Sequence, residues 1–281
     1  MGHEDENSGW RHDRGGYLGH GALPKRVMRL AHRAIERPPV RYRGYRFGLR
    51  RMVGNDVGRV WPPVESSTPL SAYFENHTTG RGIWKWRHHF PVYERHLAKF
   101  VGGEVNVLEI GIYSGGSLDM WRQYFGDGCH VHGVDIAEAC RAYASDHVDI
   151  SIGDQSDPAF WRDFLRDAPP LDIVIDDGGH EPHQQIATLE ALLPRMSHGG
   201  VYLCEDIVGV HNLFHDYIMG LARNLHAWEN PDRGQPRTIP SAFQRMVASI
   251  HLYPYMVVIE RSAVPPSEFI AARHGTEWAP F

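Results

Sequence analysis

The stretch VLEIGIYSGGS, residues 107–117, decides the fold, because it joins a buried strand to a helix through a glycine-rich turn. The nearly continuous apolar run over Asn106–Ile112 predicts a strand that is buried on both faces. A helical pattern follows over Ser117–Phe125. Units of this kind build parallel sheets with helices on both faces. The stretch therefore predicts an α/β domain.

The same alternation continues downstream. Further strands are expected at His130–Ile136, Val148–Gly153, Asp172–Asp176 and Val201–Cys204, and helices at Pro158–Asp167 and Glu181–Met196, the last of them ended by Gly199 and Gly200. Two late runs, Met246–Leu252 and Met256–Glu260, flank a Tyr-Pro-Tyr turn and predict a hairpin. The expected fold is a Rossmann-like, doubly wound, mostly parallel sheet with an antiparallel C-terminal hairpin strand and an N-terminal accessory segment.

Composition sets the broad class. The chain has 281 residues, 42% of them hydrophobic, and a formal net charge of -5. These values fit a globular protein and point to no charged partner for the whole chain. The cysteines Cys129, Cys140 and Cys204 are too few and too scattered for a disulfide framework or a CxxC metal site, and they fit a reducing cytoplasm. No apolar run is long enough to predict a transmembrane helix, and none follows the N-terminus as in a signal peptide.

Four regions follow from the pattern along the chain. Residues 1–22 are polar and rich in Gly and His, which predicts a disordered tail, and residues 23–68 form a basic accessory segment. Residues 69–104 are expected to form a helical lid or cap, and residues 105–281 the ligand-binding domain. The aromatic and basic run Trp84–His89 follows Gly80 and Gly82, which could act as hinges. It is expected to be a flexible lid over the site, or alternatively a surface helix packed on the sheet.

The first turn has the order acid-x-Gly-x-x-x-Gly, beginning with Glu109 and Gly111. It lacks the dinucleotide fingerprint, because Tyr113 stands where the second glycine should be. An acid at this point repels a pyrophosphate but suits a cationic ligand. S-adenosylmethionine carries both an ammonium and a sulfonium group, so it is the expected ligand. The alternative is an ordinary glycine-rich turn.

The next two strand ends carry residues suited to a nucleoside. Asp135 ends the second strand and is expected to bind ribose hydroxyls, while Asp154 and Gln155 end the third and should meet the adenine. Asp157 is better explained as a helix cap, and capping is also an alternative for Asp154. The full set of expected cofactor-binding residues is Glu109, Gly111, Tyr113, Ser114, Ser117, Asp135, Asp154, Gln155 and Asp176.

Four carboxylates follow strands four and five, in the pairs Asp176-Asp177 and Glu205-Asp206. Such a cluster is costly without a cation, since like charges raise one another's pKa values. Oxygen ligands favour a hard divalent ion such as Mg²⁺, so Asp177, Glu205 and Asp206 are the expected metal ligands. Separate capping roles are the alternative. A zinc site with His180 and His183 lacks a cysteine partner.

His180 begins the helix after the fourth strand, three residues beyond Asp177. A neutral imidazole beside a metal-bound hydroxyl is a suitable general base near neutral pH. His180 is therefore the expected catalytic residue. His183, one helical turn further on, remains open as an alternative base, and a solvent-exposed histidine without a role is also possible.

These motifs resemble a known group of enzymes. The run Leu108–Ser117 is similar to the first motif of catechol O-methyltransferase, in which the base is a lysine. The sequences DDGGH (176–180) and GVYLCED (200–206) resemble more closely the Mg²⁺-dependent sugar O-methyltransferases of macrolide antibiotic pathways, and the cephamycin-pathway methyltransferase family is also similar. Over residues 69–281 the resemblance implies methyl transfer from S-adenosylmethionine to a sugar hydroxyl, with His180 as base and the Asp/Glu/Asp set on Mg²⁺.

Two other functional classes are compatible with parts of the sequence. A nucleic-acid-modifying methyltransferase would place the arm Lys25–Arg51 on phosphates and stack Tyr42, Tyr45 and Phe47 on bases. Packing of this arm on a neighbouring subunit of a homo-oligomer is favoured instead, because the acidic centre disfavours a polyanion. A non-catalytic nucleoside-binding protein is disfavoured because base and metal set are both present. The expected partner is a small-molecule hydroxyl acceptor, a glycosylated natural product, with no membrane.

Overall fold

The computed structural model describes residues 42–49, 68–227 and 237–276. The chain divides into two compact units, Met1–Pro63 and Val64–Phe281. In the first unit, the described part is a helix over residues 42–49 with exposed side chains. The predicted tail at 1–22 and most of the basic segment at 23–68 lie outside the described residues. Among the helices of the described ranges, none is long and apolar enough to cross a membrane.

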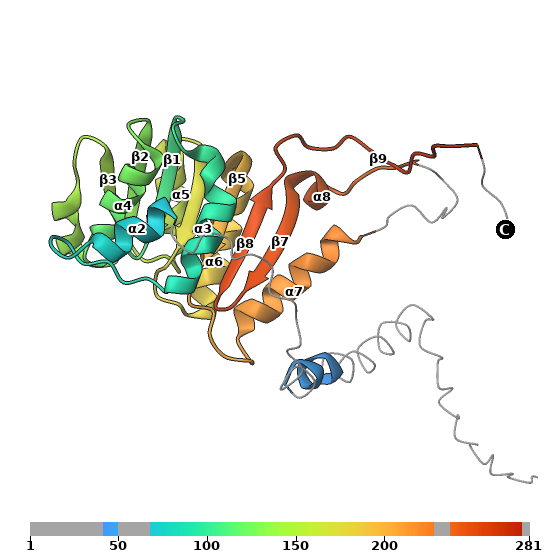
Figure 1. Ribbon diagram of the computed structural model, residues 1–281, viewed down its shortest axis with the longest axis horizontal. Coiled ribbons are helices and arrows are strands. Elements are labelled where there is room, and N and C mark those ends of the chain that lie inside the picture. The colour runs from blue at the N-terminus through green and yellow to red at the C-terminus, as the bar shows by residue number, and fades with distance from the viewer. Residues whose placement is uncertain (1–41, 50–67, 228–236, 277–281) are drawn as a thin grey trace, which may run out of the picture. The chain divides into compact units, whose positions relative to one another are not determined.

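The second unit is built on a seven-stranded sheet of order β3-β2-β1-β4-β5-β8-β7 (Figure 1). The strands β1 to β5 are parallel, whereas β8 and β7 run antiparallel at one edge. Their bounds are β1 Val105–Ile110, β2 Cys129–Asp135, β3 Val148–Ile152, β4 Leu171–Asp176, β5 Met196–Cys204, β7 Val247–Tyr253 and β8 Met256–Arg261. The predicted Rossmann-like fold with a C-terminal hairpin is confirmed.

Helices cover both faces of this sheet (Figure 1). One face packs against α2 (Pro69–Asn76), α3 (Phe90–Leu97) and α4 (Gly116–Phe125), and the other against α5 (Pro158–Asp167), α6 (Pro182–Leu192) and α7 (Leu213–Leu225). Alternate strand residues divide between the two cores: Val107 lies in the first and Leu108 in the second. This division explains why the central strands read as continuous apolar runs.

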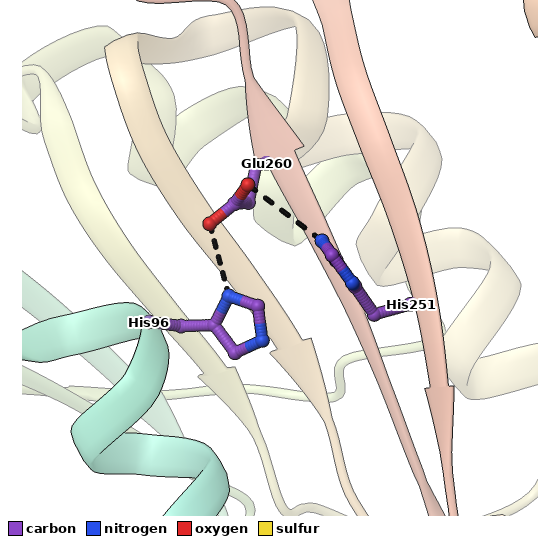
Figure 2. A group of neighbouring side chains, drawn as sticks. All are labelled: His96, His251 and Glu260. Carbon is purple, nitrogen blue, oxygen red and sulfur yellow. Dashed lines mark hydrogen bonds and ion pairs between the residues drawn. The ribbon is translucent and has the colours of Figure 1, made fainter.

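Short elements complete the unit. They are the 3-10 helices η1 (Arg87–His89), η2 (Ala98–Phe100), η3 (Glu138–Tyr143) and η4 (Leu193–Arg195), the helix α8 (Ala242–Met246), and the two-stranded sheet of β6 (Arg237–Thr238) and β9 (Phe269–Ile270). Over the C-terminal hairpin, His96 of α3 contacts Glu260 of β8, with 2.9 Å between Nδ1 and Oε1 (Figure 2). The helix is thereby tied to the C-terminal hairpin.

The end of α6 was predicted wrongly. The sequence placed the helix as far as Met196, with Gly199 and Gly200 as its terminator, but the helix ends at Leu192. Pro194 lacks the backbone N–H that would continue the helical hydrogen bonds, and η4 follows instead. The two glycines lie within β5. Gly199 adopts a φ of +76° there, close to a register shift between β4 and β5.

Candidate active site

A cavity of about 580 Å³ opens at the carboxyl ends of β1 to β5. This is the edge at which open α/β sheets bind ligands. Of the predicted site residues, eleven line it: Gly111, Tyr113, Ser114, Ser117, Asp135, Asp154, Gln155, Asp177, His180, Glu205 and Asp206. Glu109 and Asp176 are buried and do not line it. The topology thus gathers residues that are far apart in the sequence.

The glycine-rich turn after β1 requires glycine for two reasons. Gly111 has a φ of +82°, and a Cβ there would lie 2.1 Å from the backbone oxygen of Asp177. A Cβ on Gly116 would lie 2.3 Å from the carbonyl oxygen of Arg81. The Gly116 N–H donates to the carbonyl of Gly82 at 3.2 Å. The turn is therefore packed between the end of β4 and the segment that precedes η1.

The residues predicted to hold the nucleoside differ in how free their side chains are. The carboxylate of Asp135 accepts backbone N–H groups of Tyr113 at 3.1 Å and Ala137 at 2.8 Å. Asp154 accepts from the backbone N–H and hydroxyl of Ser156, both at 2.7 Å, and these bonds lower its pKa. Asp157 caps α5 through the Ala159 N–H at 2.7 Å, as predicted. Asp154 therefore combines an exposed carboxylate with a capping contact.

Gln155, which lines the cavity, and Asp176, which lies behind it, form a buried pair. Gln155 donates to Asp176 Oδ1 at 3.0 Å and accepts the Gly179 N–H at 2.7 Å. Tyr202 donates its hydroxyl to Asp176 Oδ2 at 3.0 Å. Burial raises the pKa of Asp176, although these hydrogen bonds oppose the shift. The pair fixes the turn between β4 and α6, which carries Asp177 and His180.

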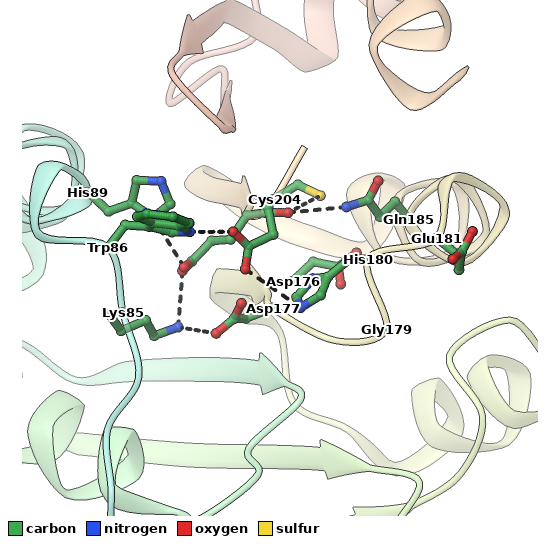
Figure 3. A network of polar contacts seen from close by, with 12 residues as sticks. Lys85, Trp86, His89, Asp176, Asp177, Gly179, His180, Glu181, Gln185 and Cys204 are labelled. Carbon is green, nitrogen blue, oxygen red and sulfur yellow. Dashed lines mark hydrogen bonds and ion pairs between the residues drawn. The ribbon is translucent and has the colours of Figure 1, made fainter. Parts of the chain in front are cut away.

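Asp177, His180 and Asp206 converge at the cavity. Each offers one ligand atom, and these atoms all lie within 4.8 Å of one another. Figure 3 draws Asp177 and His180 of this group together with Lys85. His180 Nε2 lies 3.6 Å from Asp206 Oδ2. His180 and Asp206 both have positive φ values, of 60° and 54°, and so does Tyr113 on the facing turn, at 45°. Such strained backbone gathers at functional sites, where the surrounding structure maintains it.

A lysine that sequence reasoning missed lies against the acidic centre. The side chain of Lys85 is only 2% exposed, and its Nζ contacts three carboxylates: Asp177 Oδ2 at 2.7 Å, Glu205 Oε1 at 3.1 Å and Glu109 Oε1 at 3.3 Å. Burial opposes its charge, but the acids outweigh burial and raise the pKa of Lys85 well above its usual value. Lys85 is therefore a permanent cation of the site.

Glu205 is the most enclosed acid of this group. It accepts the hydroxyl of Tyr93 at 2.7 Å and lies 3.4 Å from His89 Nδ1. Burial opposes its ionisation, but Lys85, His89 and Tyr93 outweigh burial and lower the pKa of Glu205 to about 2. It is thus a fixed negative charge that is tied to η1 and α3.

The pKa of Asp177 is raised, whereas that of Glu205 is lowered. Burial raises the pKa of Asp177 to about 8, and the nearby Glu205 and Glu109 add to the effect against the opposing charge of Lys85. One ammonium therefore does not neutralise the acids around it. Ligand atoms of Asp177, Asp206 and His180 lie together, whereas Glu205, the third predicted ligand, is not in this group. A further cation would favour the ionised form of Asp177, and carboxylate and imidazole donors fit a divalent ion.

The segment Gly82–Trp86 forms one wall of the cavity. The Trp86 indole N–H donates to Asp206 Oδ1 at 2.6 Å, while Trp84 is 86% exposed. The run was singled out from sequence as a lid, but the inward direction of Lys85 was not foreseen. The sequence contained one signal for a buried cation at this place: four carboxylates at one sheet edge repel one another unless a positive charge lies nearby.

Comparison with known proteins agrees with this geometry. Residues 108–207 match the model of a methyltransferase domain. Its curated relatives include the 8-demethyl-8-alpha-L-rhamnosyl tetracenomycin-C 2'-O-methyltransferase of Streptomyces olivaceus, 34% identical over 66% of this chain and 53% of the relative. Demethylmacrocin O-methyltransferase of Streptomyces fradiae is 37% identical over 44% and 33%. The resemblance to sugar O-methyltransferases of antibiotic pathways is confirmed.

A solved structure has the same fold. The MycE methyltransferase of the mycinamycin biosynthetic pathway, in complex with Mg, SAH and mycinamycin VI, matches with a TM-score of 0.56 and 26% identity, over 69% of this chain and 52% of that one. This chain spans about half the length of MycE and of the tetracenomycin relative, and about a third of the macrocin relative. The likeness therefore concerns the methyltransferase domain.

Proposed function

We propose that this chain transfers a methyl group from S-adenosylmethionine to a hydroxyl group of a small molecule, and that the acceptor is a sugar diol of a glycosylated natural product. The observation that carries the proposal is the convergence of Asp177, His180 and Asp206 beside a cavity formed by the glycine-rich turn. The name of the Streptomyces olivaceus relative, a 2'-O-methyltransferase of an alpha-L-rhamnosyl tetracenomycin, supports the acceptor class.

In this proposal the cofactor lies along the strand ends. The backbone of Gly111 and Tyr113, with Ser114 and Ser117, would surround its amino-acid part, and Asp135 its ribose. Asp154 and Gln155 would flank the adenine. Glu109 and Asp176 do not line the cavity and would hold cofactor-binding side chains in place. Glu109 accepts the Ser117 hydroxyl at 2.7 Å, and Asp176 accepts from Gln155 at 3.0 Å.

Asp177, Glu205 and Asp206 are the proposed ligands of Mg²⁺. When bound, the ion would lower the pKa of an acceptor hydroxyl and hold the neighbouring oxygen of the diol. The half-exposed His180 would take the hydroxyl proton on Nε2. The oxygen then forms a bond to the methyl carbon as the carbon–sulfur bond breaks, which leaves S-adenosylhomocysteine. The walls of the cavity would orient the two reactants.

The choice of His180 over His183 also has support. His180 lines the cavity and lies close to Asp206, whereas His183 is not among the lining residues.

A cytoplasmic location is part of the proposal, supported by three buried cysteines that form no disulfide.

The function is tested with a panel of acceptors: rhamnosylated polyketides, a catechol and transfer RNA. S-adenosylhomocysteine formation is expected with a sugar diol and not with RNA. In His180→Ala the rate should fall by about 10²–10⁴-fold, the usual contribution of a general base. Calorimetry should show unchanged binding of S-adenosylhomocysteine, because His180 faces the acceptor.

His183→Ala is the matched control and should keep a near-normal rate. Methylation of RNA with no glycoside turnover would reject the proposed acceptor class. A normal rate in His180→Ala would reject the assignment of the base.

A further inference from the structure

A second cluster of metal-binding residue types lies apart from the cavity. His96 of α3, His251 of β7 and Glu260 of β8 each offer a ligand atom, and these atoms all lie within 4.8 Å of one another (Figure 2). His96 Nδ1 is 2.9 Å from Glu260 Oε1, and His251 Nε2 is 3.6 Å from Glu260 Oε2. None of the three lines the candidate active site.

The hairpin register explains why these groups meet. Ser249, His251 and Tyr253 are alternate residues of β7, so their side chains share one face of the sheet. Glu260 pairs with Ser249 across the hairpin and projects to the same face. α3 packs over this face and brings His96, which is only 3% exposed, against the carboxylate.

The spacing fits a small transition-metal ion. Zn²⁺ binds imidazole nitrogen and carboxylate oxygen at about 2.0–2.2 Å, so tetrahedral ligand atoms lie roughly 3.3 Å apart. The separations of 2.9 and 3.6 Å, which join the two imidazoles to different oxygens of Glu260, lie on either side of that value. Since one ligand atom from each residue lies within 4.8 Å of the other two, these atoms would need to move closer by about 1.5 Å at most to surround an ion.

The outer contacts are also those of a metal site. A histidine ligand normally donates its second ring N–H to an oxygen that fixes the ring. His96 Nε2 lies 2.9 Å from the hydroxyl of Tyr253, which can accept this proton when Nδ1 binds the ion. Ser249 Oγ lies 2.9 Å from both Glu260 Oε2 and His251 Nε2, so the serine hydroxyl, or a water that it holds, can fill a fourth position.

The protonation states agree with this geometry. Burial lowers the pKa of His96, although Glu260 opposes the shift, so its imidazole is neutral at neutral pH. Burial opposes ionisation of Glu260, but its hydrogen bonds with His96 and Ser249 outweigh burial and lower its pKa. Neutral imidazole and ionised carboxylate are the forms that bind a metal.

We propose that His96, His251 and Glu260 bind a structural Zn²⁺ ion that joins α3 to the β7–β8 hairpin. This inference does not depend on the proposed methyl transfer. A third group, His130, His132 and Asp149, also falls within ligand distance, but its Asp149 side chain is 67% exposed and all three residues lie on β2 and β3. A variant of that group, His130→Ala, is the matched control for zinc binding.

The test uses the full chain, stripped with EDTA and dialysed free of chelator. Zn²⁺ is added with millimolar Mg²⁺ present, and the retained zinc is measured after gel filtration. Wild-type protein should retain one zinc ion more than His251→Ala or Glu260→Gln, and zinc should raise its unfolding temperature. In either variant the affinity of the site should fall by at least about 100-fold, since even loss of a residue that only orients a ligand costs 10- to 100-fold.

Two variants keep the test decisive. At least one of these two variants should fold, because His251 lies on the edge strand and Glu260→Gln preserves the shape of the side chain. The unfolding temperature of each variant without metal will show whether it folds. His130→Ala and Asp206→Asn should retain the same zinc. Equal zinc content and equal zinc-induced stabilisation in wild type, His251→Ala and Glu260→Gln would overturn the proposal, as would a wild type that retains no zinc.

Discussion

Lys85 determines the electrostatics of the candidate site. Its ammonium lies among three carboxylates in a nearly solvent-free position. Removing one partner of a buried ionic group leaves uncompensated charge and typically costs about 3–5 kcal/mol. The sequence offered no direct sign of this contact, because the inward direction of a lysine depends on how the segment before η1 packs against the strand ends.

Lys85→Met should therefore lower the free energy of unfolding by about 3–5 kcal/mol, because Glu109, Asp177 and Glu205 lose their common cation. Urea unfolding of the purified chain measures this. Lys99→Met is the control: Lys99 is exposed, donates to the Gly199 carbonyl at 2.9 Å and lies over the Phe100 ring, so its loss should cost less than about 1 kcal/mol. Equal losses in the two variants would show that Lys85 carries no special electrostatic role.

At the scale of elements, the wall Gly82–Trp86 is the feature most open to movement. It combines a buried Lys85 with an exposed Trp84, and Gly80 before it has a φ of +94°. The sequence predicted that this run would serve as a lid, and the structure places it against the cavity. Whether it moves remains a prediction.

If the wall closes over ligands, trypsin should cut after the exposed Arg87 more slowly when S-adenosylhomocysteine, Mg²⁺ and an acceptor glycoside are present. Mass spectrometry of timed digests gives the cleavage rate at this bond. Cleavage after the exposed Arg166 of α5 serves as an internal reference that should not change. Equal rates after Arg87 with and without ligands would count against a lid.

His132 of β2 predicts that the stability of the fold depends on pH. Burial, helped by the neighbouring His130, lowers the pKa of His132, while Asp149 opposes the shift. The folded pKa therefore lies below the unfolded value of about 6.5. The stability that the neutral ring contributes is fully present above about pH 6.5 and is lost as the pH falls through the folded pKa.

Between about pH 7.5 and pH 5.5, wild type should lose more stability than His132→Leu, each measured by urea unfolding relative to its own value at the higher pH. The apolar variant has no proton to bind at this position, whereas every other titrating group is shared. Identical pH profiles would mean that His132 does not titrate differently on folding.

Much of the element pattern followed from local signals. The boundaries of α5 were predicted to the residue because Asp157 and Pro158 mark its start chemically. The end of α6 was missed because Gly199 and Gly200 gave a stronger apparent stop than Pro194. The convergence of Asp177, His180 and Asp206 could be predicted because parallel strands bring their carboxyl ends together. The contacts of Lys85, Trp86 and Tyr93 with these acids could not be predicted, since they depend on tertiary packing.

At the scale of the whole molecule, one helix links the two polar centres. Tyr93 of α3 donates to Glu205 in the candidate active site, and His96, three residues later, belongs to the proposed zinc site. An ion that fixes α3 would therefore also fix the partner of an active-site acid. The chain matches about half of MycE, and the described methyltransferase domain contains the complete set of proposed reacting groups.

The central claim is that Asp177, Glu205 and Asp206 hold a metal ion on which methyl transfer depends. The direct measurement is the rate of methyl transfer from radiolabelled S-adenosylmethionine to the preferred glycoside, in EDTA-treated chain with and without added Mg²⁺. The account predicts a loss of at least about 100-fold on chelation, full recovery with Mg²⁺, and S-adenosylhomocysteine binding that persists throughout. Full activity in the EDTA-treated, metal-free chain would contradict it.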